Sequence, residues 1–277
     1  MKPLIAALCL SCLPAGAFAS EGVFDVHVHI WEGERSVEAY RAQVAASGIP
    51  LAGFGGIFMA QAGQPDRTTQ KNDELLALAR RHADFVAIGS VHPYDGDAAI
   101  AELERVKEAG MSAIKLHSHT QKLDAADPRV VAVCKRAGEL GMVVLFDDAN
   151  VTPGENAKLF DLAIRAPQTR FVFTHMGALE FRFWNLLPLA RTADGLLADN
   201  IWFDVSAIVT LIPGSPLEDE FVWTMRNVGI DRLLLGSDFP QFSLQQNLEA
   251  LEKLPLTAEE KAKIRAGNAR ALFGLQG

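Results

Sequence analysis

The chain has 277 residues, 49% of them hydrophobic, and a formal net charge of −8 from 26 basic and 34 acidic side chains. Such an acidic balance argues against nucleic acid or an anionic membrane surface as a partner. A chain of this size and apolar content can bury a large core without covalent cross-links.

The first nineteen residues have the pattern of a signal peptide. Lys2 supplies a positive end, residues 4–13 form an apolar run, and an Ala-Phe-Ala sequence ends at Ala19. The run is too short for a membrane span, and no later segment offers the roughly 18 apolar residues needed. We expect cleavage near Ala19, export to the periplasm or the medium, and a single domain over residues 20–277. A lipid anchor on Cys12 is the alternative, which the preceding residues fit poorly.

The three cysteines are not expected to form an internal disulfide. Cys9 and Cys12 would leave with the signal peptide, so that Cys134 stays alone in the mature chain. Cys134 lies in a run with helical periodicity, where a small buried residue is a better interpretation than a nucleophile.

Short β-rich runs alternate with longer helical ones along the rest of the chain, at roughly 32 residues per unit, which is the length of a βα unit. Several of the β-rich runs are almost wholly apolar, as expected of parallel strands buried on both faces. The predicted strands are 23–30, 56–60, 85–91, 113–116, 142–146, 170–174, 201–205 and 232–235.

Local signals mark the helices between these strands. Asp127 followed by Pro128 predicts a helix start, because the carboxylate caps free N–H groups and proline suits the first helical position. Thr257 and Glu260 have the spacing of a capping box, which predicts a last helix running to about Phe273.

Eight βα units can close into a (β/α)8 TIM barrel or spread into an open, doubly wound sheet. A dinucleotide-binding open sheet would carry G-x-G-x-x-G after its first strand, whereas residues 27–31 read HVHIW. The sequence therefore favours the barrel.

The histidines give further support, because six of the seven lie at or just past the predicted ends of strands one, three, four and six. In a barrel these carboxyl ends form one rim, where active sites are built. The exception is His82, which falls in a helical run. The other six are His27, His29, His92, His117, His119 and His175.

His27 and His29 are two residues apart on the first strand, so both imidazoles project to the same face and could bind one metal ion. The alternative is a pair of hydrogen-bonded core histidines. Asp238 directly follows an apolar strand, where a carboxylate is costly to bury unless it is paired or bound to metal. The alternative for Asp238 is a helix N-cap.

Lys115 and His117 share a face of the fourth strand by the same alternation. Lys115 could orient a substrate carboxylate or carbonyl oxygen, or could be a rim lysine paired with an acid. His117 could hydrogen-bond the substrate or a metal ligand. Trp31 could form an apolar pocket wall or have a plain packing role. For His92 and His119, a solvated position in a loop explains the residue as well as a role in the site does.

Five short motifs together resemble the amidohydrolase superfamily, in the amidohydrolase-related branch that includes aminocarboxymuconate semialdehyde decarboxylase. The resemblance implies a distorted (β/α)8 barrel with one or two divalent ions, usually zinc. It places His27, His29 and Asp238 at metal positions and His175 at the histidine of strand six. The motifs occupy residues 25–29, 110–117, 171–177, 234–240 and 267–270.

The sequence departs from the family pattern at the end of strand five, where Asp147 stands in place of the usual histidine. Asp147 could be a substitute oxygen ligand, which would favour a harder ion such as manganese. It could instead accept a hydrogen bond that orients a ligand histidine. The change could also mark loss of tight metal binding, since some lactonases that resemble this branch work without a metal.

Our leading hypothesis from the sequence is a metal-dependent hydrolase with one divalent ion, for which we expect zinc, with manganese as the alternative. The ion, held by His27, His29 and Asp238 with Asp147 or His175, would lower the pKa of bound water toward ~7. The hydroxide formed from that water would attack an ester, lactone or amide bond of a small-molecule substrate. Asp238 would take up the proton.

In this hypothesis His175 and Lys115 would stabilise the oxyanion. The alternative is a decarboxylase of an unsaturated or aromatic acid, in which Arg67 and Arg182 could hold carboxylates. A lesser alternative is an exported binding protein without catalysis. The long segments 60–72 and 177–200 carry no motif that identifies the substrate, and no motif determines whether the chain forms a homo-oligomer.

Overall fold

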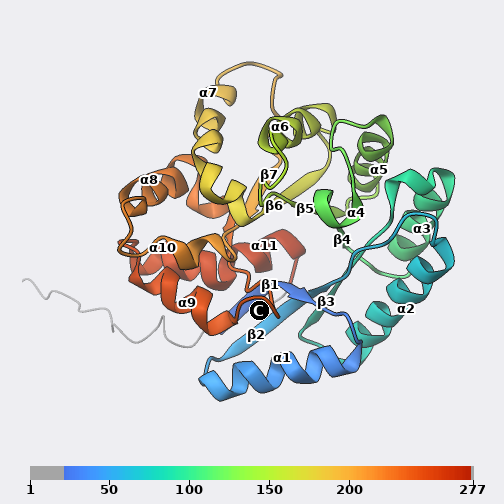
Figure 1. Cartoon of the computed structure of the whole chain (residues 1–277), viewed down its shortest axis with the longest axis horizontal. Helices are drawn as coiled ribbons and strands as arrows, with labels where there is room; N and C mark the ends of the chain where they lie inside the picture. The colour runs from blue at the N-terminus through green and yellow to red at the C-terminus, as the bar shows by residue number, and fades with distance from the viewer. Residues whose placement is uncertain (1–21, 276–277) are drawn as a thin grey trace, which may run out of the picture.

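The computed structural model describes residues 22–275, and the predicted signal peptide over residues 1–19 lies outside them. Eight parallel strands follow one another in chain order around a single sheet, with helices on its outside (Figure 1). The strands are β1 (Val23–His29), β2 (Leu51–Ile57), β3 (Phe85–Gly89), β4 (Ala113–Leu116), β5 (Val143–Asp147), β6 (Arg170–Thr174), β7 (Ile201–Asp204) and β8 (Leu233–Leu234).

Contacts between the chain after β8 and the first strand close the sheet into a barrel. Val26 donates its N–H to the carbonyl of Leu235 at 3.0 Å, and a parallel bridge joins Val28 to Phe239. The (β/α)8 barrel predicted from the sequence is therefore confirmed.

The helices are short to medium in length and surround the barrel. They are α1 (Glu34–Ser47), α2 (Pro65–Arg81), α3 (Asp97–Glu108), α4 (Ser118–Gln121), α5 (Pro128–Glu139), α6 (Glu155–Arg165), α7 (Leu187–Ala190), α8 (Glu218–Val228), α9 (Leu244–Lys253), α10 (Ala258–Ala262) and α11 (Asn268–Phe273). No helix within residues 22–275 has both the length and the apolar character required to span a membrane.

The predicted helix signals operate as expected, with one change at the end of the chain. Asp127 caps α5 by accepting a hydrogen bond from the Arg129 N–H, and Thr257 forms a capping box with Glu260 at the start of α10. The last predicted helix does run to Phe273, and a π-helical stretch over Lys263–Gly267 lies between α10 and α11.

The second strand begins earlier than predicted, at Leu51 instead of residue 56. The glycines of this segment weaken its strand signal in the sequence. In the fold they are needed for close packing: a Cβ added at Gly55 would lie 2.6 Å from Ile88, and one added at Gly56 would lie 2.3 Å from the Phe85 ring. Close packing against β3 therefore requires glycine at these two positions.

The barrel interior and the layer beneath the helices form two separate hydrophobic clusters. On β5, Val143 and Leu145 face the interior cluster, while Val144 and Phe146 pack in the outer one. The same alternation carries Asp147, the next inward position, to the mouth of the barrel. Because side chains alternate along each strand, inward-facing polar side chains at the strand ends lie together at the mouth of the barrel.

Candidate metal-binding active site

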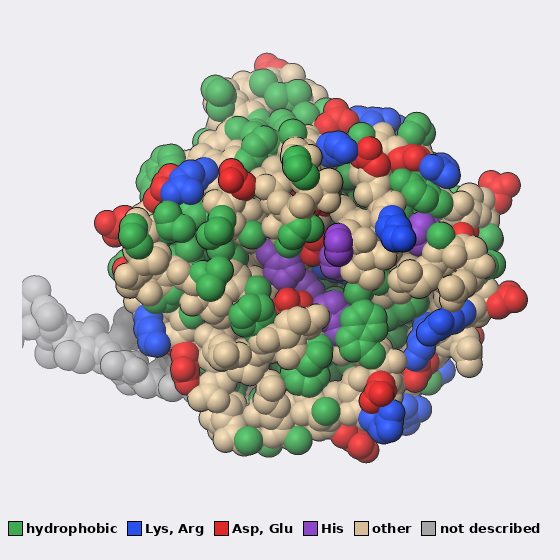
Figure 2. Space-filling view, in the orientation of Figure 1, with side chains coloured by type: hydrophobic (Ala, Val, Ile, Leu, Met, Phe, Trp, Pro, Cys, Tyr) green, Lys and Arg blue, Asp and Glu red, His purple; other side chains and the backbone are tan. Residues whose placement is uncertain are grey.

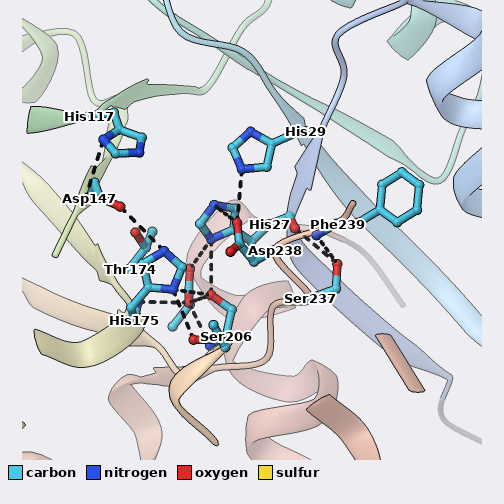
Figure 3. Close-up of polar contacts among 12 residues, drawn as sticks. His27, His29, His117, Asp147, Thr174, His175, Ser206, Ser237, Asp238 and Phe239 are labelled. Atoms are coloured by element: carbon cyan, nitrogen blue, oxygen red, sulfur yellow. Dashed lines mark hydrogen bonds and ion pairs between the residues drawn. The ribbon is translucent and has the colours of Figure 1, made fainter. Parts of the chain in front are cut away.

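Three of the predicted ligands meet at the carboxyl ends of β1 and β8 (Figure 3). His29 Nε2 lies 3.0 Å from Asp238 Oδ1, and His27 Nε2 lies 3.5 Å from the same oxygen. One ligand atom from each of the three residues falls within 4.8 Å of the others, a spacing that can hold a metal ion. Both histidines are buried, and Asp238 is partly open to the cavity above them.

The register of β1 explains how both histidines reach the mouth. The pairing with β2 shifts between Asp25 and Val28, so that Val26 packs in the barrel interior and Val28 in the outer layer. Such a shift changes which side chains face inward. His27 and His29, on the side of the strand opposite Val28, are turned toward Asp238.

Asp238 is held in an uncommon backbone conformation, with φ of 63°. A non-glycine residue is costly in this region and persists where its surroundings hold it. Here the Asp238 N–H donates to the His27 carbonyl at 2.9 Å, and the His29 N–H donates to the Phe239 carbonyl at 2.9 Å. Backbone contacts with β1 thus place the carboxylate next to the two imidazoles.

Asp25 joins β1 to the segment after β8 through hydrogen bonds. Its carboxylate accepts hydrogen bonds from the backbone N–H groups of His27 at 3.0 Å and Ser237 at 2.8 Å, and from the Tyr40 hydroxyl at 2.8 Å. Burial raises the pKa of Asp25 to about 6, although these donors oppose the shift. The residue belongs to the DVHVH motif, but its role in joining β1 to the segment after β8 requires the three-dimensional structure.

Asp204, at the end of β7, is a site residue that the sequence analysis did not single out. Its Oδ2 accepts a hydrogen bond from His27 Nδ1 at 2.9 Å. Its Oδ1 accepts from the backbone N–H groups of Ser206 at 2.9 Å and His175 at 3.2 Å, and from the Ser206 hydroxyl. A signal was available, because Asp204 is a carboxylate at the end of an otherwise apolar strand.

The donor set of His27, His29 and Asp238 fits a divalent ion. Burial, with the charge of Lys115, lowers the pKa of His27 to about 4, so its imidazole is neutral and can bind metal. Burial would raise the pKa of Asp238, but the hydrogen bond from His29 and the nearby histidines lower it, so the group is a carboxylate. Two neutral imidazoles and a carboxylate suit zinc or manganese.

A second group with metal-binding spacing consists of His27, His175 and Asp204. Both oxygens of Asp204 are already engaged by protein donors, and His27 Nδ1 is the atom that Asp204 binds. With these contacts, the role of Asp204 is to orient His27. The other His27 nitrogen, Nε2, faces Asp238. We therefore place the candidate metal centre at His27, His29 and Asp238.

His175 follows β6 and faces the same cavity from the other side. Its Nδ1 lies 3.1 Å from the Ser206 carbonyl, and its Nε2 lies 3.5 Å from Asp147 Oδ1. Burial would lower the pKa of His175, but the hydrogen bond and the charge of Asp147 outweigh it and raise the pKa to about 9. The raised pKa favours the protonated form of His175 in the metal-free protein.

Asp147 lies between two histidines, with Oδ1 facing His175 and Oδ2 lying 3.6 Å from His117 Nδ1. Burial would raise the pKa of Asp147, but His175, His117 and Lys115 hold it well below its usual range. Among the residues the structure describes, Asp147 belongs to neither group with metal-binding spacing. Its geometry is that of a carboxylate that orients histidines.

The remaining predicted site residues fall in three different places. His117 and Trp31 line the cavity, and Trp31 stacks on His29 with ring centroids 5.1 Å apart and planes 7° apart. Lys115 is fully buried beneath the cavity, where its Nζ donates to the Thr174 hydroxyl at 2.9 Å. Arg182 forms an ion pair on the surface with Glu220.

The cavity above these residues has a volume of about 430 Å³. Figure 2 shows the hollow, with histidine side chains gathered at its base. Met59 and Gln241 complete part of its wall, and His119 also lines it. His92 does not: its ring is buried against the Gln121 carbonyl at 2.9 Å. Cys134 is buried in α5, away from this cavity.

Fold and site define a (β/α)8 barrel with a candidate divalent-metal centre at the carboxyl ends of its strands. A model of the family described as amidohydrolase matches residues 24–275. The chain belongs to this family, which confirms the resemblance seen in the sequence. Comparison with curated proteins by sequence gave no match.

Several solved structures share the fold at low sequence identity. A 5-carboxyvanillate decarboxylase from Novosphingobium aromaticivorans, solved with manganese, is 18% identical with a TM-score of 0.65, over 89% of this chain and 85% of that chain. A 2,6-dihydroxybenzoate decarboxylase from Rhizobium is 15% identical with a TM-score of 0.66, over 93% and 100%. A candidate 2-pyrone-4,6-dicarboxylic acid hydrolase from Pseudomonas putida is 19% identical with a TM-score of 0.63, over 92% and 98%.

Proposed function

We propose that the protein is a metal-dependent lyase that decarboxylates an unsaturated or aromatic carboxylic acid. The observation that carries this proposal is the group of His27, His29 and Asp238 at the mouth of the barrel. Structures with the same fold include decarboxylases of aromatic acids. The sequence alone favoured hydrolysis, and the structural comparisons support the decarboxylase alternative better.

The site would hold one divalent ion through the two imidazoles and the carboxylate. Such an ion would act as a Lewis acid toward oxygen atoms of the substrate. The manganese in a decarboxylase of the same fold supports manganese as the ion, whereas the histidine nitrogens are equally suited to zinc. We propose manganese as the first ion to test.

Decarboxylation breaks the bond between the carboxylate and its neighbouring carbon, and that carbon keeps the electron pair and must take up a proton. His175 is placed to supply it. Its Nδ1 is held by the Ser206 carbonyl, and its Nε2 faces the cavity beside Asp147 (Figure 3). Asp147 stabilises the protonated ring. Lys115 lies beneath the cavity without lining it and helps to keep Asp147 ionised. His175 would therefore be the general acid.

The second candidate is the hydrolysis of an ester, lactone or amide. A candidate pyrone hydrolase of the same fold supports it. The position of Asp238 also supports it, because this carboxylate lies next to His29 and is exposed enough to contact a water molecule. In this reaction Asp238 would accept the proton from the attacking water.

The experiment begins with elemental analysis of the purified protein. Protein loaded with manganese or zinc is then incubated with aromatic and unsaturated acids, with carbon dioxide release as the readout, and with lactones and esters, with acid release as the readout. Carbon dioxide release is the expected result. Cleavage of lactones or esters without carbon dioxide release would establish the hydrolase instead.

The variant Asp238→Asn separates an enzyme from a binding protein. We expect it to keep the fold, as judged by circular dichroism, and to lose at least about 100-fold in turnover, because it removes a charged ligand of the ion. Asp231→Asn, on an exposed carboxylate outside the cavity, is the control. A wild-type protein that binds acids with no turnover of any of these compounds would contradict the proposed function.

A further inference from the structure

The backbone pairing between β3 and β4 ends below the mouth of the barrel. Two residue pairs join these strands, Ile88 with Ala113 and Gly89 with Ile114. The chain after β4 continues to His117, whose side chain lines the metal-binding cavity. Backbone groups near the mouth therefore need partners other than the neighbouring strand, because buried N–H and C=O groups are rarely left unpaired.

The side chain of Gln121, a buried residue at the end of α4, supplies such partners. Its Oε1 accepts a hydrogen bond from the His117 N–H at 2.9 Å. Its Nε2 donates to the carbonyls of Ala60 at 3.0 Å and Val91 at 3.1 Å. One amide group thus satisfies three backbone groups, which belong to the segments just after β2, β3 and β4.

His92 holds the backbone of Gln121 in place. Its Nδ1 accepts a hydrogen bond from the Tyr94 N–H at 3.2 Å, so the ring proton lies on Nε2. That nitrogen donates to the Gln121 carbonyl at 2.9 Å. The Gln121 N–H in turn donates to the His117 carbonyl at 3.0 Å. The main chain and the side chain of Gln121 therefore both fix the turn over residues 117–121.

This turn forms part of the wall of the metal-binding cavity. His117, His119 and Thr120 all line it, and Figure 3 shows the His117 ring next to Asp147. Burial lowers the pKa of His117 to about 4, so the ring is neutral near pH 7. A neutral imidazole has one donor and one acceptor nitrogen, and it can therefore hydrogen-bond a bound substrate.

We propose that Gln121 is a positioning residue of the active site. Its amide group anchors the turn over residues 117–121 and thereby holds the His117 ring where it can hydrogen-bond the substrate. This inference rests on the proposed function in taking the metal-binding cavity as the place where substrate binds, and it applies to decarboxylation and hydrolysis alike. It also gives His92, which does not line the cavity, a role in supporting Gln121.

Hydrogen exchange of backbone amides, followed by NMR in zinc-loaded protein, tests the anchor without a substrate. Gln121→Met keeps the length of the side chain but removes its hydrogen bonds. We expect the His117 amide to exchange at least about tenfold faster in this variant, relative to the amides of β5, because its acceptor is lost. An unchanged relative rate would overturn the anchor.

The matched control is Asn200→Leu. Asn200 is buried just before β7, and its side-chain amide also donates to three backbone carbonyls, but it does not line the cavity. The variant should lose stability while the relative exchange rate of the His117 amide stays that of the wild type. A change of the same size in both variants would show that the effect of Gln121→Met is a general loss of stability, which would also overturn the anchor.

The effect on substrate is measured with a double-mutant cycle of Gln121→Met and His117→Phe in manganese-loaded protein, on the acid, lactone or ester that the turnover assays identify. Each single variant should raise KM about five- to tenfold, the loss of one hydrogen bond, with a smaller change in kcat. The double variant should show no further rise, because Gln121 acts through His117. Asn200→Leu should leave KM unchanged.

The outcomes for Gln121 are distinct from those for the proposed function. Cleavage of a lactone or ester without carbon dioxide release would refute decarboxylation, and the cycle would still be measured on that substrate. Rises in KM that multiply in the double variant would overturn the positioning role of Gln121, even in a protein that releases carbon dioxide.

Discussion

Asp204 and His27, which are 177 positions apart in the chain, form a buried hydrogen bond of 2.9 Å between Oδ2 and Nδ1. This contact determines which nitrogen of His27 is free. With Nδ1 bound to Asp204, Nε2 is directed at Asp238. The geometry of the candidate metal centre therefore depends on a strand-seven residue that does not itself face the ion.

We expect Asp204→Asn to weaken metal binding about 10- to 100-fold, the usual effect of removing a carboxylate that orients a metal-binding histidine. The amide keeps the size of the side chain but loses the charge that favours a proton on Nδ1. Manganese affinity is measured by titration with a competing chelator. Asp199→Asn, in a surface ion pair with Arg191, is the control. Equal affinity in wild type and Asp204→Asn would show that Asp204 does not orient the ligand.

The stability of the metal-free protein should depend on pH through His175. Its pKa is raised from 6.5 in the unfolded chain to about 9 in the fold by Asp147, against the effect of burial. The fold then binds the proton more tightly, so the stabilisation is complete below pH 6.5 and is lost as the pH rises to about 9.

Urea unfolding between pH 6 and pH 9.5, in the presence of a chelator, measures this dependence. The free energy of unfolding of the wild type should fall over the interval, and that of His175→Gln should fall less. Parallel curves for the two proteins would mean that His175 is not charged in the fold.

Trp31→Leu should raise KM more than it lowers kcat, because Trp31 lines the metal-binding cavity and is not a ligand candidate. The loss of the stack on His29 removes contact area that orients a flat substrate, and we expect about a tenfold rise in KM, equivalent to about 1.4 kcal/mol of binding. Trp223→Leu, an exposed tryptophan on α8, serves as the matched variant. A change confined to kcat would place Trp31 in the chemistry itself.

Export remains a proposal from the sequence. If the signal peptide is cleaved after Ala19, the exported protein should begin at Ser20, and Edman degradation or intact mass measurement would identify this end. Exported protein that retains Met1 would contradict cleavage, and protein found only inside the producing cells would contradict export.

Short-range patterns in the sequence determined most of the architecture. Alternating apolar runs and helix caps such as Asp127 and Thr257 act within a few residues, so each can be read locally. The strand ends they mark are enough to place His27, His29 and Asp238 at one rim, since all strands of a parallel barrel end on the same side. The missing G-x-G-x-x-G motif and the placement of the histidines favoured a barrel over an open sheet, and five short motifs indicated the family.

Only the tertiary structure decided which side chains pair across the rim. The bond of His27 to Asp204, the place of Asp147 between His117 and His175, and the ion pair that keeps Arg182 at the surface all join residues far apart in the chain. Their distances follow from how the strands register and how the barrel closes, which no local pattern encodes. The glycine-rich second strand is a similar case, because only its neighbours' bulky side chains explain its length.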